Sequence, residues 1–261
     1  MNLVIKRDYA ECAQYVAEYI ASKILNAKPT KSQPFVLGLP TGSTPLGVYT
    51  TLIKMVESKK LSFENVVTFN MDEYAGLSKE SPQSYHYFMM NNFFNHIDIK
   101  KENIHIPDGM AKDVEAECIE YEKKLKEYGA ISLFFGGVGV DGHIAFNEPF
   151  SALTSRTHVH ALAEETIRSN SRFFGGDYTL VPKLALTVGI GTIMGADEVL
   201  IMATGHNKAH AVKEAIEGAI SSEYTITALQ MHKNATIVCD EDATWDLKVG
   251  TYRYFKKANP V

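Results

Sequence analysis

The sequence predicts one α/β domain, a doubly wound and mainly parallel sheet with helices on both faces. Short apolar runs alternate with segments of helical periodicity from end to end, as in strand–helix–strand repeats. Most of these runs are apolar throughout, which is typical of strands buried on both faces. The 261 residues are 45% hydrophobic and 22% charged, an ordinary globular mixture. No linker, repeat or low-complexity segment interrupts them, so residues 1–261 are predicted to form a single domain.

Short apolar or β-branched runs are the predicted strands. They are Leu3–Lys6, Phe35–Leu39, Val66–Phe69, Ile131–Phe135, Ala185–Val188, Val199–Ala203 and Thr236–Cys239. The first predicted helix begins at Asp8, with Glu11 three residues on in a variant of the capping-box spacing. Its apolar residues from Ala13 to Ile24 recur at helical spacing and form one face. The other predicted helices are Pro45–Glu57, Tyr85–His96, Val114–Tyr128, Lys208–Glu217 and Ala243–Phe255. The least regular stretch, about Pro149–Pro182, is interpreted as an insertion over one edge of the sheet.

Composition excludes several classes of protein. The 26 basic and 31 acidic residues give a net charge of −5, which argues against a nucleic-acid surface. No apolar run approaches the roughly 20 residues of a membrane-spanning helix, and the N-terminus carries charges where a signal peptide is apolar. Three scattered cysteines predict neither a disulfide framework nor a thiolate metal site. We therefore expect a cytoplasmic protein with no nucleic-acid or membrane partner.

Unusual residues follow four of the predicted strands. These clusters are Pro40–Pro45, Met71–Tyr74, Gly136–His143 with Asn147–Pro149, and Gly205–Lys208. In open α/β sheets, ligands bind beyond the carboxyl ends of the strands. If the strands are parallel, the four clusters face one crevice.

The segment Thr41-Gly42-Ser43-Thr44 has the composition of an anion-binding loop. Gly42 permits a tight turn, Ser43 and Thr44 add hydroxyl donors, and Pro45 suits the first turn of a helix. Free N–H groups at such a helix start bind phosphate. The alternative is a well-capped turn without a ligand. Lys208, at another helix start, is either a second phosphate contact or a solvated lysine.

The run GGVGVDG contains a G-x-G-x-x-G pattern formed by Gly137, Gly139 and Gly142. After a strand, this pattern can indicate a dinucleotide-binding loop. Here Pro149 soon interrupts the helix that should follow, and no acidic residue stands at the expected position on the next strand. The context argues against a dinucleotide.

Asp141, His143 and Glu148 form a short acid–imidazole–acid set. A carboxylate beside a histidine can fix its tautomer and raise its basicity for proton transfer. The alternative is a metal site that also uses Asp72 and Glu73, but the ligand set is incomplete; His206 and His210 do have i, i+4 spacing. Taken singly, Asp141 could cap a turn, Glu148 could lie at the surface and His143 could be a core residue.

Asp72 follows a predicted strand and is flanked by Phe69, Met71 and Tyr74. Partial desolvation in such surroundings raises the pKa of a carboxylate and suits it to act as a base on carbon. A phosphate loop, a carboxylate base and an acid–imidazole pair suit proton transfer beside the carbonyl of a small sugar phosphate. The residues permit this reaction class without naming the substrate.

Several long motifs resemble those of the glucosamine-6-phosphate deaminase family. They are LGLPTGSTP (37–45), VVTFNMDEY (66–74), GGVGVDGHIAFNEP (136–149), SRFF (171–174), ALTVGIGT (185–192) and LKVGTYRYF (247–255). The resemblance covers nearly the whole chain and implies a Rossmann-like fold with a lid segment. It implies conversion of glucosamine 6-phosphate and water into fructose 6-phosphate and ammonia in N-acetylglucosamine catabolism, with no metal or organic cofactor.

The resemblance also implies residue roles. Asp72 would move a proton between C2 and C1, and His143 would open the sugar ring, assisted by Asp141 and Glu148. The phosphate would bind to Thr41–Thr44 with Arg172 and Lys208. Arg172 lies in the irregular stretch, the family's lid, beside Gly175-Gly176, which would let the lid move.

A second site of the family binds N-acetylglucosamine 6-phosphate between subunits, and here its pattern is incomplete. Ser151 and Tyr254 match, but His158 and His160 replace the usual Arg and Lys, and Ala161 replaces a polar residue. The resemblance implies a homo-oligomer, a hexamer in much of the family, and leaves regulation open. Two rival functions are a phosphosugar-sensing module, which has no need of the acid–base residues, and a 6-phosphogluconolactonase, which needs no base on carbon.

Overall fold

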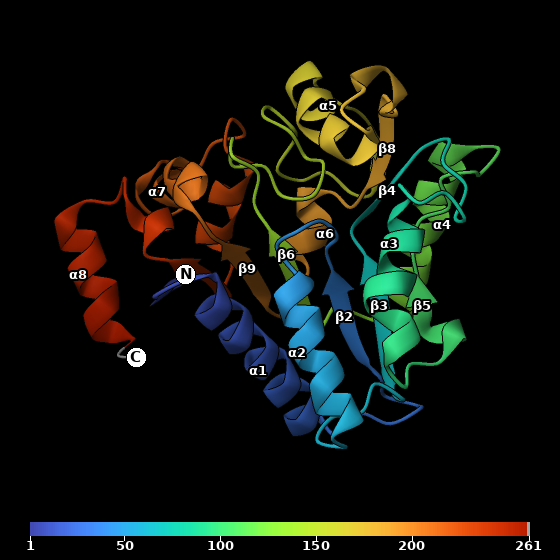
Figure 1. Cartoon of the computed structure of the whole chain (residues 1–261), viewed down its shortest axis with the longest axis horizontal. Coiled ribbons are helices and arrows are strands. Elements are labelled where there is room, and N and C mark those ends of the chain that lie inside the picture. Colours follow the sequence, from blue (N-terminus) through green and yellow to red (C-terminus); the bar gives the residue numbers. More distant parts are fainter. Residues whose placement is uncertain (260–261) are drawn as a thin grey trace.

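The computed structural model describes residues 1–259, and its centre is a seven-stranded sheet in which every strand pair is parallel (Figure 1). In spatial order its strands are β1 (Asn2–Lys6), β10 (Ala235–Asp240), β9 (Val199–Ala203), β6 (Leu133–Gly137), β2 (Phe35–Leu39), β3 (Val66–Asn70) and β5 (Ile104–His105). All of these strands except β5 were predicted, although the predicted range of β6 began and ended two residues too early. The doubly wound fold class is therefore confirmed.

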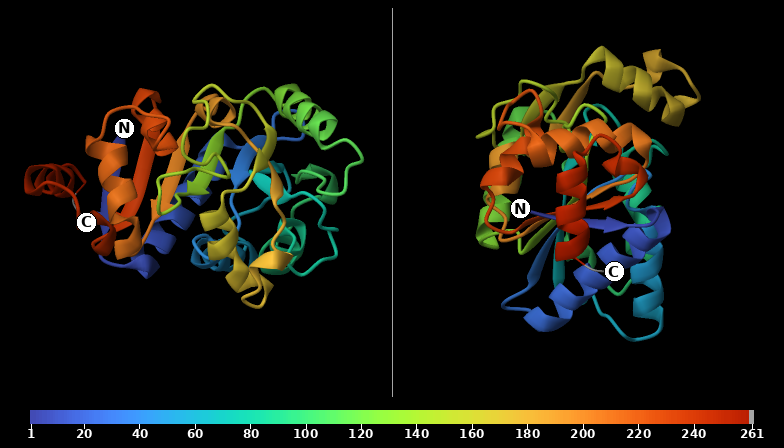
Figure 2. Two further views of the ribbon diagram at one scale, coloured as in Figure 1. Left: turned by 90° about the horizontal axis from the view of Figure 1, so that it is seen from above. Right: turned by 90° about the vertical axis from the view of Figure 1, so that its left-hand side faces the viewer.

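Helices cover both faces of this sheet, as predicted (Figures 1 and 2). They are α1 (Tyr9–Ala27), α2 (Leu46–Glu57), α3 (Tyr85–Asn92), α4 (Val114–Glu127), α6 (Ile190–Met194), α7 (Ala209–Glu217) and α8 (Val249–Ala258). The predicted cap of α1 is present, because the Asp8 carboxylate accepts the Glu11 N–H at 2.9 Å. The predicted apolar face of α1, from Ala13 to Ile24, is buried. In the described residues no helix has the length and apolar composition needed to cross a bilayer.

Two helices are shorter than predicted, one at its C-terminal end and the other at its N-terminal end. The one predicted over Tyr85–His96 ends at Asn92, because Phe93 leaves the helical region. The one predicted over Ala243–Phe255 begins only at Val249, since Lys248 is extended and donates its N–H to Glu217. Short 3-10 turns lie between the larger elements: η1 (Phe94–His96), η2 (Lys101–Asn103), η3 (Ser171–Phe174), η4 (Tyr178–Leu180), η5 (His206–Lys208), η6 (Thr225–Met231) and η7 (Asp242–Thr244).

A second, three-stranded sheet is antiparallel and was not predicted. It has the order β4 (Asp72–Tyr74), β8 (Leu184–Thr187) and β7 (His158–Ala161). The run Ala185–Val188, predicted as a strand of the parallel sheet, is β8 here. It is apolar because Ala185 packs with Tyr74, Phe146 and Phe174 in a separate small core. Apolar composition indicates such burial but carries no information on strand direction.

The segment 162–183 is an excursion from this small sheet, and we call it the lid segment. It contains α5 (Glu164–Asn170), η3 and η4. Ala161 pairs with Leu184, so the segment leaves and rejoins the sheet at neighbouring positions. Figures 1 and 2 show it projecting beyond the rest of the chain, over the carboxyl ends of the parallel strands.

The strand order reverses between β2 and β6. From β2 the chain proceeds to β3 and β5 on one side, and it then returns to β6 on the other side of β2. Loops that leave two such strands diverge and open a crevice at the carboxyl edge. The loops at this reversal are those that begin at Pro40 and Val138, two of the four clusters that the sequence singled out.

Candidate active site

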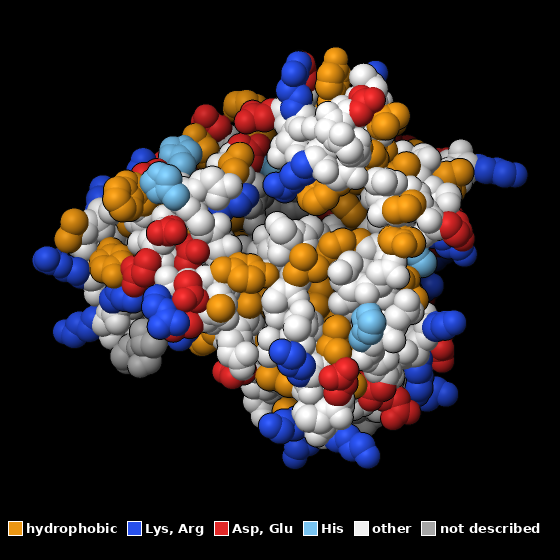
Figure 3. All heavy atoms as spheres, viewed as in Figure 1, with side chains coloured by type: hydrophobic (Ala, Val, Ile, Leu, Met, Phe, Trp, Pro, Cys, Tyr) orange, Lys and Arg blue, Asp and Glu red, His pale blue; other side chains and the backbone are white. Residues whose placement is uncertain are grey.

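A pocket of about 620 Å³ lies at this edge beneath the lid segment, and Figure 3 shows it as a hollow. The loops after β2, β3, β6 and β9 contribute to it, as the predicted parallel strands require. The structure brings most of the predicted site residues together here. The predicted residues that line the pocket are Thr41, Gly42, Ser43, Thr44, Asp72, Asp141, His143, Arg172 and Lys208.

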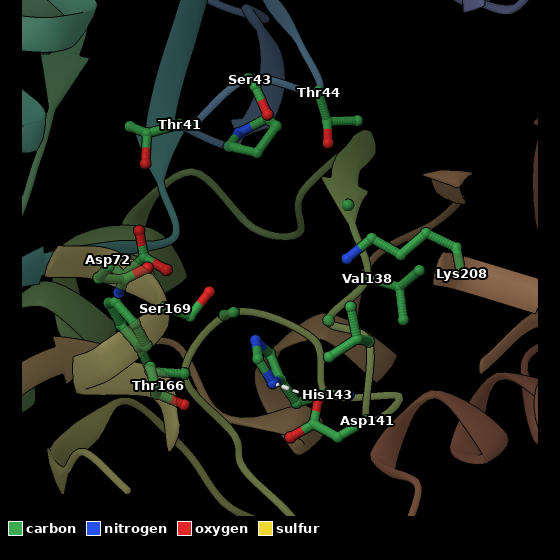
Figure 4. A pocket seen from close by; sticks show the side chains of 18 of the residues that line it. Thr41, Ser43, Thr44, Asp72, Val138, Asp141, His143, Thr166, Ser169 and Lys208 are labelled. Carbon is green, nitrogen blue, oxygen red and sulfur yellow. Dashed lines mark hydrogen bonds and ion pairs between the residues drawn. The ribbon is translucent and has the colours of Figure 1, made fainter. Parts of the chain in front are cut away.

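The loop Thr41–Thr44 forms one wall of the pocket. Gly42 has a φ of +87°, a left-handed conformation that favours glycine. The Tyr9 hydroxyl donates to the Thr44 carbonyl at 3.2 Å and accepts the Gly47 N–H at 2.9 Å, which ties the loop to α1. In Figure 4 the side chains of Thr41, Ser43 and Thr44 extend into the pocket. The wall thus offers hydroxyl donors close to a helix start, an arrangement that suits phosphate.

Two basic side chains face the same space. Lys208 ends η5, and Figure 4 shows its Nζ pointing toward the middle of the pocket. Burial lowers the pKa of Lys208; Arg172 lowers it further, and Asp141 opposes both. A bound anion would stabilise the charged form of Lys208. Arg172, from η3 of the lid segment, brings a second positive charge whose guanidinium lies 4.7 Å from the Phe173 ring centre.

Asp141 and His143 form a contact pair on the floor of the pocket. Their Oδ1 and Nδ1 atoms are 2.7 Å apart (Figure 4). Burial alone would raise the pKa of Asp141, but the hydrogen bond and charge of His143 outweigh it and lower that pKa. A carboxylate on Nδ1 fixes the tautomer of the ring and leaves Nε2 for a ligand.

Gly139 explains part of the glycine-rich pattern. A Cβ at this position would lie 2.4 Å from His143 Nδ1 and 2.6 Å from Asp141 Oδ1. The Gly139 N–H also donates to the His143 carbonyl at 2.8 Å. The glycine therefore makes room for the acid–imidazole pair.

Asp72 begins β4, and its side chain enters the pocket from the side opposite Lys208 (Figure 4). It is 6% exposed, and burial, followed by the charge of Glu73, raises its pKa well above the usual range. Glu73 turns the other way, where its carboxylate accepts the N–H groups of Tyr85 and His86 at the start of α3. The two adjacent acids thus have different surroundings, and Asp72 alone lines the pocket.

Glu148 does not line the pocket. Both of its carboxylate oxygens accept the Ala163 N–H, at 3.0 and 2.8 Å, and His160 Nε2 lies 3.8 Å away. Burial would raise the pKa of Glu148, but hydrogen bonds from His160, Thr166 and Ala163 lower it. The structure therefore places Glu148 at the base of the lid segment, and its assistance to His143 stays a prediction.

The residues of the predicted second site are spread over the chain. His158 and His160 lie on β7 with ring centres 5.6 Å apart, next to Ala161. Ser151 has a buried hydroxyl with no partner in residues 1–259. Tyr254 lies exposed on α8, at the opposite end of the molecule from β8 in Figure 1. Tyr254 and the β7 histidines therefore do not form one site within a single chain.

The metal alternative has no assembled ligand set. Within residues 1–259, no three His, Cys, Asp or Glu side chains lie in an arrangement that could hold a metal ion. His206 stacks edge-on against Trp245, and His210 Nε2 lies 3.2 Å from the Tyr224 hydroxyl.

Sequence reasoning missed the face of α5 that covers the pocket. The residues on it are Glu165, Thr166, Ser169 and Asn170. The Asn170 amide donates to the Tyr74 hydroxyl at 2.9 Å, which connects the lid to β4. The sequence feature that could have indicated this face is the three- and four-residue spacing of its polar side chains up to Arg172. A short helix without an apolar stripe, however, produces little detectable periodicity.

Comparisons with known proteins extend over nearly the whole chain. The profile of a family described as glucosamine-6-phosphate isomerases/6-phosphogluconolactonase matches residues 7–238. A protein of Treponema denticola named glucosamine-6-phosphate deaminase is 63% identical over 98% of this chain and 94% of its own length. One of Phocaeicola vulgatus with the same name is 60% identical over 99% of this chain and 100% of its own.

Solved structures share the fold. A monomeric glucosamine-6-phosphate deaminase superposes with a TM-score of 0.89 at 41% identity, covering 94% of this chain and 99% of that one. A 6-phosphogluconolactonase from Leishmania guyanensis gives a TM-score of 0.73 at 20% identity, covering 95% and 99%. At that identity the second likeness establishes the fold alone.

Proposed function

The chain belongs to the family of glucosamine-6-phosphate isomerases and 6-phosphogluconolactonases, and on this premise we infer the reaction of its pocket. It converts glucosamine 6-phosphate and water into fructose 6-phosphate and ammonia, a step of amino-sugar catabolism. Asp72 is the observation that carries this choice within the family, because it is a buried carboxylate of raised pKa that faces the pocket. Isomerisation needs such a base on carbon, whereas hydrolysis of a lactone does not.

The phosphate of the substrate binds to the loop Thr41–Thr44, between Lys208 and Arg172. Hydroxyl and N–H donors of the loop meet the phosphate oxygens, and the two basic residues supply charge that the chain as a whole, at −5, lacks. Arg172 comes from the lid segment, so phosphate binding draws the lid over the pocket.

His143 opens the sugar ring by moving a proton between the ring oxygen and the C1 hydroxyl. Its Nδ1 is held by Asp141, so Nε2 is the atom that accepts and returns the proton. Glu148 enters this step through the family resemblance alone; in this structure it holds the Ala163 N–H.

Asp72 then removes the proton from C2 of the open chain and returns it to C1. As C1 gains this proton, its carbonyl oxygen takes up a proton and the C2 amino group loses one, so the product has an imine at C2 and a hydroxymethyl group at C1. Water then adds to the imine, which releases ammonia and leaves the C2 ketone. Asp72 takes the C2 proton in its charged form, and its buried position then favours the neutral form that carries this proton to C1.

Ammonia release tests this function. The purified chain is expected to produce ammonia and fructose 6-phosphate in equal amounts from glucosamine 6-phosphate. Hydrolysis of 6-phosphogluconolactone without ammonia release would identify the lactonase instead. Binding of the sugar phosphate with turnover of neither substrate would identify a sensing module.

We also propose that the chain forms a cytoplasmic homo-oligomer. Exposed apolar side chains support an interface, notably Phe150 at 76% and Trp245 at 73% exposure. Light scattering on the purified chain measures the oligomeric state directly. A mass of 29.0 kDa would identify a monomer, the state of the solved relative, and would contradict the proposal.

A further inference from the structure

The lid helix presents a charged face to the pocket that the proposed mechanism uses only in part. Glu165 lies near the start of α5, and Arg172 follows the helix in η3; both line the pocket. Thr166 and Ser169 lie between them at helical spacing. Glu165 lies in the first turn of α5 and Arg172 lies beyond its last residue, so the acid and the base stand near opposite ends of the lid helix. The lid therefore offers the ligand an anion at one end and a cation at the other.

Glu165 differs from its neighbour Glu164 in what it faces. Glu164 forms an ion pair with Arg168, with Oε1 2.5 Å from Nη2, and does not line the pocket. Glu165 lines the pocket, and its side chain forms no hydrogen bond or ion pair with another of residues 1–259. Both acids stand in the first turn, where negative charge stabilises a helix whichever way it points. Helix stabilisation therefore does not explain why one of them faces the pocket.

The other carboxylates that line the pocket, Asp72 and Asp141, each have another role in the proposed mechanism. Asp141 is bonded to His143 at 2.7 Å. Asp72 is 6% exposed and is the proposed base on C2, so its carboxylate faces the C2 proton. Within the described part of the chain, Glu165 is thus the lining carboxylate that remains available to a positively charged group of a ligand.

The position of α5 indicates which group of the ligand this is. Figure 4 shows Thr166, the next residue after Glu165, and Ser169 on the same side of the pocket as Asp72, with Lys208 reaching in from the opposite wall. The amino group of glucosamine 6-phosphate is attached to C2, the carbon on which Asp72 acts, and the phosphate is at the far end of the sugar. A substrate whose C2 faces Asp72 therefore has its C2 group on the side of the pocket where Thr166 and Ser169 of α5 lie, and Glu165 is the carboxylate that α5 contributes to the pocket lining.

We propose that Glu165 binds the ammonium group of the substrate and so selects amino sugar phosphates over sugar phosphates with a hydroxyl at C2. This specificity role rests on the proposed function and deepens it. A carboxylate and an ammonium group form a charge-assisted hydrogen bond, about twice as strong as a neutral one. A substrate with both charges contacts both ends of the lid face, whereas a neutral sugar phosphate contacts only Arg172.

The test compares two ligands that cannot react because their aldehyde is reduced. The first, 2-amino-2-deoxyglucitol 6-phosphate, carries an ammonium group at C2, and the second, glucitol 6-phosphate, carries a hydroxyl there. Calorimetry gives the dissociation constant of each for the full chain and for the variants. We expect the wild type to prefer the amine and Glu165→Gln to weaken its binding about tenfold, the loss of one charge-assisted contact. Binding of glucitol 6-phosphate should not change.

Matched variants separate recognition from lid structure. Glu164→Gln removes the same charge from the same turn and should alter neither ligand, while Glu165→Asp keeps the charge and should retain part of the preference. Equal weakening of both ligands by Glu165→Gln, or an unchanged preference for the amine, overturns the proposal. Ammonia release tests the reaction separately. If the wild type prefers the amine through Glu165 but releases no ammonia, the proposed function is wrong and the proposed ammonium site stands.

Discussion

At Asp72 the surroundings oppose the charge that the reaction requires. Its carboxylate is buried, and burial and the charge of Glu73 raise its pKa. The folded chain therefore binds the Asp72 proton more tightly than the unfolded chain, whose aspartates titrate near pH 3.9. Between that pH and the raised pKa, the free energy of unfolding falls as pH rises. Above the raised pKa, the stability that the folded chain gains by holding the Asp72 proton is fully lost.

Asp72→Asn should separate activity from stability. An amide cannot accept the C2 proton, so ammonia release and solvent-deuterium exchange at C1 of fructose 6-phosphate should both be lost. The variant should also melt at a higher temperature than the wild type at pH 7.5, because each unit of pKa elevation corresponds to about 1.4 kcal/mol. This gap in melting temperature should narrow as pH falls toward 4. Undiminished exchange in the variant would remove Asp72 from its role.

Gly139→Ala tests the geometry of the acid–imidazole pair. Its Cβ would lie within 2.6 Å of both His143 and Asp141, so the pair has to move. A displacement of about 1 Å in a catalytic group can reduce the rate about a hundredfold, and we expect a loss of that size in kcat. Gly250→Ala is the control, because a Cβ there meets nothing within 4 Å and turnover should be unchanged. Full activity of Gly139→Ala would show that the observed pairing is not required.

Among the elements, α4 fixes the strand that leads into the lid. The buried Glu122 carboxylate accepts hydrogen bonds from the Thr157 N–H at 3.0 Å, from the Thr157 and Thr192 hydroxyls, and from Arg156. Arg156 in turn donates to the Gly191 carbonyl at 2.9 Å. One side chain of α4 thereby joins the residues just before β7 to the helix that follows β8.

Glu122→Gln should destabilise the chain by about 2 kcal/mol at pH 7, because an amide nitrogen would face groups that all donate. Burial would raise the pKa of Glu122, but the hydrogen bonds of Thr192, Thr157 and Arg156 lower it. Its contribution is therefore present above the unfolded pKa of about 4.3 and is lost as pH falls through the lowered value. Urea unfolding at pH 7 and pH 3 measures this difference. Exposed Glu120, on the same helix, is the control; an equal loss in Glu120→Gln would contradict the assignment.

The elements also show where sequence reasoning succeeds. Runs such as Val199–Ala203 are apolar because both faces are covered, so composition alone predicts them. β4 begins at Asp72 and has three residues, and β7 contains two histidines; neither has the composition of a strand. Both are held by pairing with β8, a contact distant in sequence. A pattern confined to neighbouring residues cannot report such a contact.

The same limit applies to the site. Residues at the ends of parallel strands, such as Asp72 and His143, were predicted because the fold class fixes where strand ends meet. Arg172 was identified only by resemblance, and Glu165 was not predicted. Both reach the pocket because the lid segment folds back over it, which depends on the small sheet and its separate core.

At the scale of the whole molecule, we expect regulation to depend on the histidines of the predicted second site, His158 and His160. Histidines stand at positions 158 and 160, where the fixed positive charges of Arg and Lys are usual in the family. We expect little or no activation by N-acetylglucosamine 6-phosphate, because its phosphate would lose the charge-assisted hydrogen bonds of Arg and Lys. Substrate saturation with and without effector, on the wild type and on a His158→Arg, His160→Lys variant, measures this. Strong activation of the wild type at pH 8 would show that other groups hold the effector.

The pairing of Ala161 with Leu184 has a consequence for how this chain and its relatives diverge. A segment that leaves and rejoins a sheet at neighbouring positions can gain or lose residues without moving the strands that hold it. The substrate preference that we propose for the lid segment would therefore be encoded in a part of the chain whose length can vary, while Asp72 and His143 belong to strands and loops outside it. New specificities in this architecture can arise by replacing one loop, and a lid exchanged between two relatives should carry its selectivity with it.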